Sequence, residues 1–154
     1  MVNVKSFFRR DRFAAHSGMR LVSASPGRAR ARMRVGPSHL NGVGVVQGGA
    51  IFTLADLAFA AASNSHGTVA VAIQVGIQFL KAVDRGTLIA EAREVSLSPR
   101  LSSCEVRVTD GGGDLVAQFT GLAYRKKETL EEVRRRSRRP ASARRRSARG
   151  RPVS

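Results

Sequence analysis

The sequence predicts an α+β domain in which one long apolar helix lies against an antiparallel β-sheet. The expected order is a short helix, two strands, one long central helix and four further strands. The links between the last four strands are short, which favours antiparallel pairing because parallel neighbours need a long crossover. One apolar helix beside such a sheet makes a two-layer domain.

The N-terminal part supplies the short helix and the first two strands. Residues 3–15 suit an amphipathic helix, and Met19–Ser25 reads as a strand that ends at a Pro-Gly turn. Residues 28–35 alternate arginine with alanine, methionine or valine, as in a half-buried strand with one solvated face. The docking face of the helix is expected to consist of Phe7, Phe8 and Phe13.

The central helix is expected from Gly48 or Gly49 to about Ser65. Its apolar residues recur at spacings of three and four, and its many alanines favour close packing on several sides. The following strands are expected at about 73–80, 87–98, 101–109 and 115–125, with a hairpin turn before the last one.

Length and composition favour one domain with a highly charged extension. The chain has 154 residues, of which 42% are hydrophobic, and no apolar run long enough to span a membrane. The single cysteine, Cys104, reads as a small core residue and fits a reducing cytoplasm. The expected organisation is an N-terminal helical segment at 1–18, the main domain at 19–126 and an arginine-rich, disordered tail at 127–154.

The net charge of +16 belongs largely to that tail. Residues 133–154 hold ten arginines and no acidic residue, so they contribute +10 and leave +6 for the rest of the chain. The tail has no apolar periodicity and could bind nucleic acid through phosphates, although it lacks the aromatic residues that read bases by stacking.

Asp56 is the first candidate for chemistry. It is the only acidic residue between Asp11 and Asp84, and it lies in an apolar, alanine-rich run. Burial raises the pKa of a carboxyl group and leaves a basic anion, which suits a general base or a nucleophile. The alternatives are a solvated helix residue or the buried partner of an arginine.

Gly48 and Gly49 open the central helix, and a helix N-terminus offers free backbone N–H groups and a partial positive charge. These groups could form an oxyanion hole for a thioester or ester carbonyl, or the pair could simply form a tight turn. Asp56 lies on the same face about 10 Å along the axis from Gly49. That separation is too large for one carbonyl carbon, so two subunits are expected to build each site.

Asn41 and Gln47 lie in the loop that enters the helix. Each could hold a carbonyl or a water molecule by hydrogen bonding, and stabilisation of a turn is the alternative role for Asn41. The three histidines do not have metal-ligand spacing, and the motifs of zinc proteases, P-loop enzymes and serine hydrolases are absent.

The stretch HLNGVGVVQGGAIFTLADLAFAAASNSHG, with the later IQFLKAVDRGTLIAEA, resembles the hotdog-fold thioesterases of the phenylacetate-degradation (PaaI) type. The resemblance covers roughly residues 12–126. It implies a long central helix wrapped by a curved antiparallel sheet, assembled as a homodimer and commonly as a homotetramer. The implied substrate is an aryl- or medium-chain acyl-CoA, and neither a metal nor a redox cofactor nor a membrane is implied.

The resemblance also implies roles for individual residues. Asp56 matches the catalytic carboxylate, Gly49 the oxyanion donor, and Asn41 the asparagine that orients water or the carbonyl. The family usually has His-Gly-Gly where this chain has Gln47-Gly48-Gly49, and glutamine can donate a hydrogen bond but cannot carry a proton. Because CoA carries phosphates, Lys81 and Arg100 are candidate contacts for its path.

Two function classes other than a thioesterase remain open from the sequence. A non-catalytic acyl-CoA-binding protein is favoured by Gln47 and opposed by Asp56. Association with nucleic acid would depend on the basic tail alone.

Overall fold

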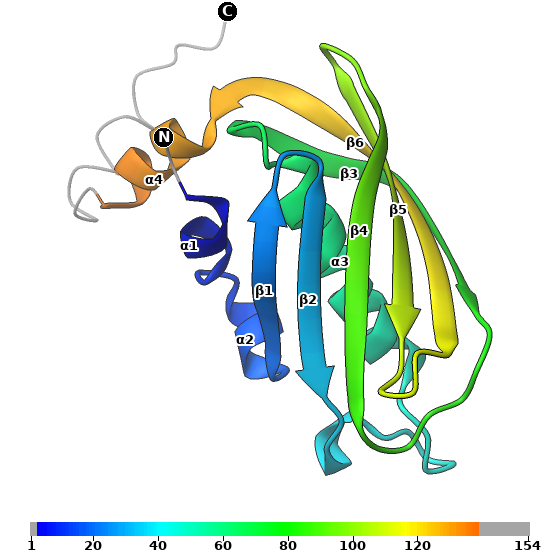
Figure 1. Ribbon diagram of the computed structural model, residues 1–154. Coiled ribbons are helices and arrows are strands. Elements are labelled where there is room, and N and C mark those ends of the chain that lie inside the picture. Colours follow the sequence, from blue (N-terminus) through cyan, green and yellow to red (C-terminus); the bar gives the residue numbers. More distant parts are fainter. Residues whose placement is uncertain (1–2, 139–154) are drawn as a thin grey trace, which may run out of the picture.

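The computed structural model describes residues 3–138 and confirms the expected order of two strands, a central helix and four further strands (Figure 1). Two short helices precede a β-hairpin, a central helix, four long strands and a last helix. The helices are α1 (Val4–Phe8), α2 (Arg12–His16), the 3₁₀ turn η1 (Pro37–His39), α3 (Gly48–Ser63) and α4 (Leu130–Arg138). The strands are β1 (Met19–Ser25), β2 (Arg28–Arg34), β3 (Thr68–Phe79), β4 (Thr87–Leu97), β5 (Leu101–Thr109) and β6 (Leu115–Thr129).

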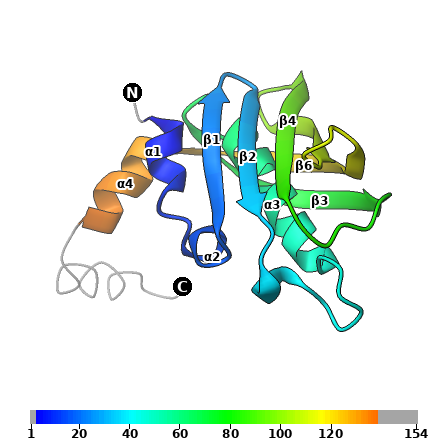
Figure 2. The ribbon, with the colours of Figure 1, turned by 60° about the horizontal axis from the view of Figure 1, so that its bottom comes forward.

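All six strands form one antiparallel sheet in the order β1-β2-β4-β5-β6-β3. The sheet curves around α3, which packs against β2, β4 and β5 (Figures 1 and 2). The two edges are therefore β1, which α1 and α2 flank, and β3, whose outer edge pairs with no other strand among residues 3–138. This arrangement is the predicted α+β fold with a central helix wrapped by a sheet.

The core lies between α3 and the concave face of the sheet. The largest buried rings are those of Phe59 on α3 and Phe119 on β6, whose centroids lie 5.6 Å apart. The alanines of α3 are mostly buried because their small side chains let the sheet backbone approach closely. Asn64 closes the helix by donating to the carbonyls of Ala60 and Ala70 and by accepting the Ala70 N–H.

The N-terminal segment differs from the single helix predicted at 3–15. It contains two helices because Asn3 and Asp11 each cap a separate start, accepting the N–H of Ser6 and Ala14. Phe13 is 68% exposed, so the expected docking role of this residue is wrong. Phe8, another residue of the expected docking face, does pack against the core.

The boundary expected at 126/127 is also wrong, because the ordered fold continues to Arg138. Strand β6 stays paired with β3 as far as Thr129, opposite Thr68, and Leu130 is buried and donates its N–H to Gly67. In α4, Arg135 forms an ion pair with Glu131, one helical turn earlier. This pair offsets the repulsion between the arginines of the helix. The rest of the predicted disordered tail lies outside the described residues.

Helix α4 lies beside α1 in both ribbon views (Figures 1 and 2), although the two are at opposite ends of the described chain. Arg10 links them by donating to the Ser137 hydroxyl at 2.6 Å. Within residues 3–138, no helix is long and apolar enough to cross a membrane.

Candidate active site

One stripe of α3 is left uncovered by the sheet and carries two of the candidate residues, Gly49 and Asp56. It consists of Gly49, Thr53, Asp56 and Ala60, at spacings of four, three and four, while most of the helix faces the core. Residues at these spacings share a face of an α-helix. The structure therefore places Asp56 on the same face as Gly49, as the sequence predicted.

Asp56 is half-buried, and burial raises the pKa of its carboxyl group above the usual value, with a further rise from the negative charge of Asp11. Within residues 3–138 no hydrogen bond or ion pair holds its carboxylate. The alternative role as a buried partner of an arginine is therefore wrong for this part of the chain. An unpaired, poorly hydrated carboxylate is suited to accept a proton from water or to attack an electrophilic carbon.

The N-terminus of α3 is capped by a candidate site residue. Gln47 is the N-cap residue, and its side-chain Oε1 accepts the backbone N–H of Gly49 at close range. This bond engages the Gly49 N–H, which the sequence suggested as a hydrogen-bond donor to an oxyanion. The Nε2 amide of Gln47 makes no hydrogen bond within the described residues, so it remains a free donor beside Gly49.

Asn41 stabilises the loop that leads into α3. Its Oδ1 accepts the N–H groups of Val43 at 3.0 Å and Val45 at 3.3 Å, and the Gln47 N–H bonds to the His39 carbonyl. Turn stabilisation, the alternative role for Asn41, is thus present. Its amide group makes no hydrogen bond within residues 3–138.

The free edge of the sheet meets the N-terminus of α3. A Cβ on Gly48 would lie 3.1 Å from the ring of Phe79, at the end of β3, so glycine lets strand and helix approach closely. Along this edge, Val71, Ile73 and Phe79 are exposed although they are apolar. A row of unpaired backbone groups with apolar side chains is typical of a strand that pairs with another chain.

Lys81 and Arg100 lie at opposite ends of the sheet. Lys81 donates to Asp110 and Asp114 at 2.6 Å each, so it is not the free cation that the sequence suggested for CoA. Arg100 donates to the Tyr124 hydroxyl at 2.7 Å. The length of β5 separates them by roughly 27 Å, so the two side chains cannot hold neighbouring phosphates.

Other nucleophiles are not arranged for catalysis. Cys104 is buried, which raises the pKa of its thiol to about 11. The Ser102 hydroxyl donates to the carboxylate of Glu94, which also bonds to His66 at 2.8 Å. In a serine hydrolase the serine hydroxyl bonds to a histidine, so this arrangement is not a catalytic triad. No group of three or more histidine, cysteine or acidic side chains within residues 3–138 could hold a metal ion.

Two residues near Asp56 were missed by the sequence interpretation. Thr53 lies between Gly49 and Asp56 on the same stripe and donates its hydroxyl to the Gly49 carbonyl at 2.8 Å. Its helical spacing from Asp56 could have indicated it. The negative charge of Asp11 raises the pKa of Asp56, and no pattern in the sequence indicates that the two residues are close.

Comparison with known proteins identifies relatives of the whole domain. The family model described as "Thioesterase superfamily" matches residues 43–117. A putative esterase of Archaeoglobus fulgidus is 40% identical over 122 residues, which cover 79% of this chain and 79% of that protein. The acyl-coenzyme A thioesterase PaaI of Escherichia coli is 33% identical over 124 residues, which cover 80% of this chain and 89% of that protein.

Solved structures agree with these sequence matches. The structure of E. coli PaaI, from the phenylacetic acid degradation operon, matches with a TM-score of 0.79 and 32% identity and covers 82% of this chain and 93% of that chain. A Streptococcus mutans protein bound to acetyl-CoA matches with a TM-score of 0.69 and 29% identity, over 72% of this chain and 90% of that chain.

Proposed function

Because this chain belongs to the PaaI-type family of hotdog-fold thioesterases, we propose that it hydrolyses aryl- or medium-chain acyl-CoA with Asp56 as the catalytic carboxylate. The chain is a thioester hydrolase. The observation that carries the role of Asp56 is its position: a half-buried, unpaired carboxylate on the same stripe of α3 as Gly49. The acetyl-CoA bound to the S. mutans relative supports a CoA thioester as substrate.

In the proposed reaction, one water molecule is consumed and the C–S bond of the thioester breaks. Asp56 either takes a proton from the water as it attacks the carbonyl carbon, or attacks that carbon itself to form an anhydride that water then opens. Both routes release the free acid and CoA, whose sulfur takes up a proton. Asn41 would orient the water or the carbonyl through its free amide group.

The developing oxyanion would be stabilised at the N-terminus of α3. Gly49 can donate its backbone N–H if the Gln47 side chain moves away, and Gln47 can donate through Nε2 if it stays. In both cases the partial positive charge of the helix N-terminus favours the oxyanion. Gly48 contributes by leaving room for the substrate to approach the backbone.

We also propose that two copies of the chain complete each site. Gly49 and Asp56 are about 10 Å apart along one helix, so a single carbonyl carbon cannot contact both from the same copy. Pairing of the β3 edge with a second copy would cover Val71 and Ile73 and would extend the sheet through both subunits. We therefore expect a homodimer, with a homotetramer as the larger alternative.

The test is release of CoA thiol from a panel of aryl- and aliphatic acyl-CoAs by the wild type and by Asp56→Asn. We expect turnover to fall by at least about 10²-fold in the variant, while acyl-CoA binding stays close to that of the wild type. Asp84→Asn is the matched control, because it removes an exposed carboxylate paired with Arg85. Full activity of Asp56→Asn would show that this carboxylate is not the catalytic one.

Isotope labelling separates the two routes for Asp56. In a single turnover in ¹⁸O-water, a general base places the label in the released acid. A nucleophile whose anhydride is opened by water at the Asp56 carbonyl instead transfers an unlabelled oxygen from Asp56 to the first product and takes up the label itself. Mass spectrometry of the product acid and of the peptide that contains Asp56 distinguishes these outcomes.

A second candidate function is acyl-CoA binding without turnover. It is favoured by the bond between Gln47 and Gly49, which occupies the expected oxyanion donor, and by the glutamine at the position of the family's histidine. Tight acyl-CoA binding with no thiol release from any member of the panel would support this function and contradict hydrolysis.

A further inference from the structure

The outer face of the sheet, turned away from α3, carries an array of arginines that the thioesterase site does not use. We call it the arginine face; its register places side chains from four neighbouring strands on one side of the sheet. Its members are Arg20 on β1, Arg28, Arg30, Arg32 and Arg34 on β2, Arg93 on β4 and Arg107 on β5.

Most of this positive charge is uncompensated. Within residues 3–138, Glu91 pairs with Arg30 and Glu105 with Arg93, and both acidic residues belong to the same face. The arginines on this face that form no hydrogen bond or ion pair within the described chain are Arg20, Arg28, Arg32, Arg34 and Arg107. Arg20 even lies directly opposite Arg32 across the β1–β2 pair. Like charges in that position destabilise a sheet unless an anion lies between them.

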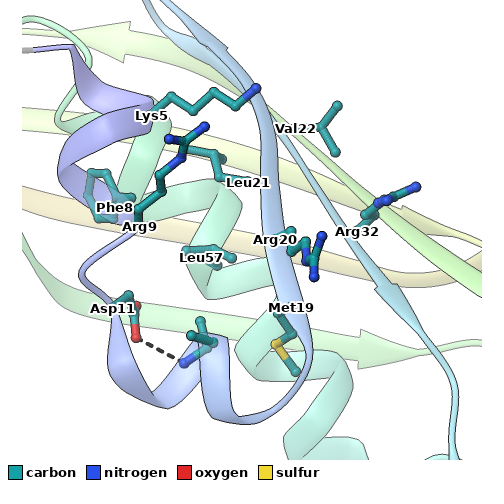
Figure 3. A pocket seen from close by; sticks show the side chains of 12 residues that line it. Lys5, Phe8, Arg9, Asp11, Met19, Arg20, Leu21, Val22, Arg32 and Leu57 are labelled. Carbon is teal, nitrogen blue, oxygen red and sulfur yellow. Dashed lines mark hydrogen bonds between the residues drawn. The ribbon is translucent and has the colours of Figure 1, made fainter.

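The arginine face is grooved along β2 as well as charged. A hollow of about 370 Å³ is lined by Arg20, Arg32 and Arg34. Another, of about 430 Å³, is lined by four arginines of β2, β4 and β5 together with Glu91 and Glu105. Arg20 and Arg32 also line a hollow of about 530 Å³ that Lys5 and Arg9 reach from the N-terminal helix region (Figure 3). Asp11 also lines this last hollow, but basic residues outnumber acidic ones in all three, which follow the length of β2 and turn toward α1.

We propose that the arginine face binds the phosphate backbone of single-stranded nucleic acid. The four arginines of β2 stand on alternate residues, about 6.7 Å apart, in a straight row. That spacing is comparable with the separation of successive phosphates in an extended strand, so the row can pair one guanidinium with each phosphate. The spacing is wider than that of phosphorus atoms in inorganic polyphosphate.

The chemistry of the face favours a linear polyanion over a lipid surface. Small polar residues flank the arginines, among them Ser23, Ser25 and Thr87, and these can donate to phosphate or sugar oxygens. No aromatic residue belongs to the arginine face, so neither base stacking nor a membrane-inserting anchor is available there. Binding should therefore be independent of base sequence and steeply dependent on salt.

The test compares two triple variants that lose the same charge. Arg20→Gln/Arg32→Gln/Arg34→Gln removes two of the four arginines of the β2 row and Arg20, which lies opposite Arg32. Arg12→Gln/Arg85→Gln/Arg135→Gln removes arginines that lie off the face. Fluorescence anisotropy of a labelled oligouridine of about 20 nucleotides gives the binding constant between about 50 and 200 mM salt. The full chain is used throughout, so residues 139–154 contribute equally to every protein.

We expect the face variant to reduce the slope of log K against log salt by about 2, which corresponds to the loss of three contacts to a single strand. The control variant should keep the wild-type slope, and both should keep the wild-type thioester turnover and melting temperature. An equal loss in both variants would show that net charge alone binds the strand, and no loss in either would place binding elsewhere; each overturns the proposal.

Two other polyanions serve as competitors. If inorganic polyphosphate binds more tightly than oligouridine and the face variant weakens its binding equally, nucleic acid is not the preferred ligand and the proposal is overturned. Vesicles that contain phosphatidylserine would do so as well if they bind through Arg20, Arg32 and Arg34 while oligouridine does not bind.

Discussion

The side-chain carbonyl of Gln47 accepts the backbone N–H of Gly49, so the candidate oxyanion donor is already engaged in the free protein. The bond also caps α3 at its N-terminus. One side chain thus stabilises the helix and engages the N–H group that we propose as a donor to the thioester carbonyl. In our proposal, the Nε2 of Gln47, which makes no hydrogen bond within residues 3–138, is the donor that remains for the substrate.

Replacement of Gln47 by glutamate should separate the two roles. The introduced carboxylate would still accept the Gly49 N–H and would interact favourably with the helix N-terminus, but it has no N–H to donate and it repels an oxyanion. We expect Gln47→Glu to keep the wild-type melting temperature and to lower kcat by at least about 10²-fold.

Gln47→Ala is the matched comparison. It removes the cap and should lower the free energy of unfolding by about 1 kcal/mol, measured by urea denaturation. If the Gly49 N–H alone stabilises the oxyanion, the alanine variant should keep kcat better than the glutamate variant does. If both variants turn over at the wild-type rate, Gln47 has no role in the reaction.

Asp11 should control the pH dependence of turnover. Its charge contributes, after burial, to the raised pKa of Asp56, and the ionised form of Asp56 is the one that can act as base or nucleophile. Activity should therefore fall as the pH drops through a pKa above the usual aspartate value. Asp11→Asn removes the like charge, so this acid limb should move to lower pH.

The asparagine variant is a mild structural change. Asp11 caps α2 through the Ala14 N–H, and asparagine caps helices about as well as aspartate. The measurement is kcat/KM against pH for both proteins with one acyl-CoA. An acid limb that stays in place, or that moves to higher pH, would show that Asp56 is not the group that titrates.

The same raised pKa makes Asp56 costly for stability. Between the unfolded pKa, near 3.9, and the higher folded pKa, the folded state binds more protons, so stability falls as the pH rises through this window. At neutral pH, Asp56→Asn should therefore raise the free energy of unfolding. The gain should vanish below the unfolded pKa, where both states are protonated, as urea titrations at pH 7 and pH 3 can check.

Much of the fold follows from local patterns in the sequence. The Pro-Gly turn after Ser25 bounded β1 correctly, and alternation placed β2. Turns bounded β4–β6, and the three-to-four spacing located α3 to within two residues. The split of the first helix depends on the Asp11 cap, which a continuous amphipathic pattern hides. The order in residues 127–138 depends on pairing with β3 and on burial of Leu130, which are tertiary effects that composition cannot register.

The candidate site was predictable only in part. The spacing of Gly49 and Asp56 fixes their common helix face, and the structure agrees. The engagement of Lys81 by Asp110 and Asp114 could not be expected, because it depends on how the β5–β6 hairpin lies beside the end of β3. The influence of Asp11 on Asp56 likewise needs the packing of α2 near α3.

The exposed edge of β3 should be the contact through which two copies associate. Ile73 is 57% exposed on this edge, and a charge there would be buried without a partner on pairing. We expect Ile73→Glu to shift the protein toward monomer in size-exclusion chromatography with light scattering and to lower turnover in parallel. Val95→Glu is the control, because Val95 is 52% exposed but lies on β4, an interior strand of the sheet.

Gly121 of β6 should tolerate no side chain, because it lies against the ring of Phe59. A Cβ at Gly121 would come within 2.8 Å of two ring carbons, and Phe59 is fully buried between α3 and the sheet. The ring cannot retreat without disturbing its contact with Phe119, so Gly121→Ala should cost about 1–3 kcal/mol of unfolding free energy.

Gly76 on β3 is the matched control for Gly121, since it is also a strand glycine without a left-handed backbone. A Cβ at Gly76 would only make an ordinary contact, 3.7 Å from the Thr120 hydroxyl oxygen. Gly76→Ala should therefore be neutral or stabilising by up to about 1 kcal/mol, because alanine loses less conformational entropy on folding. Equal melting temperatures for the two variants would mean that α3 can shift away from β6, and that the approach of Phe59 to Gly121 does not limit how closely helix and sheet pack.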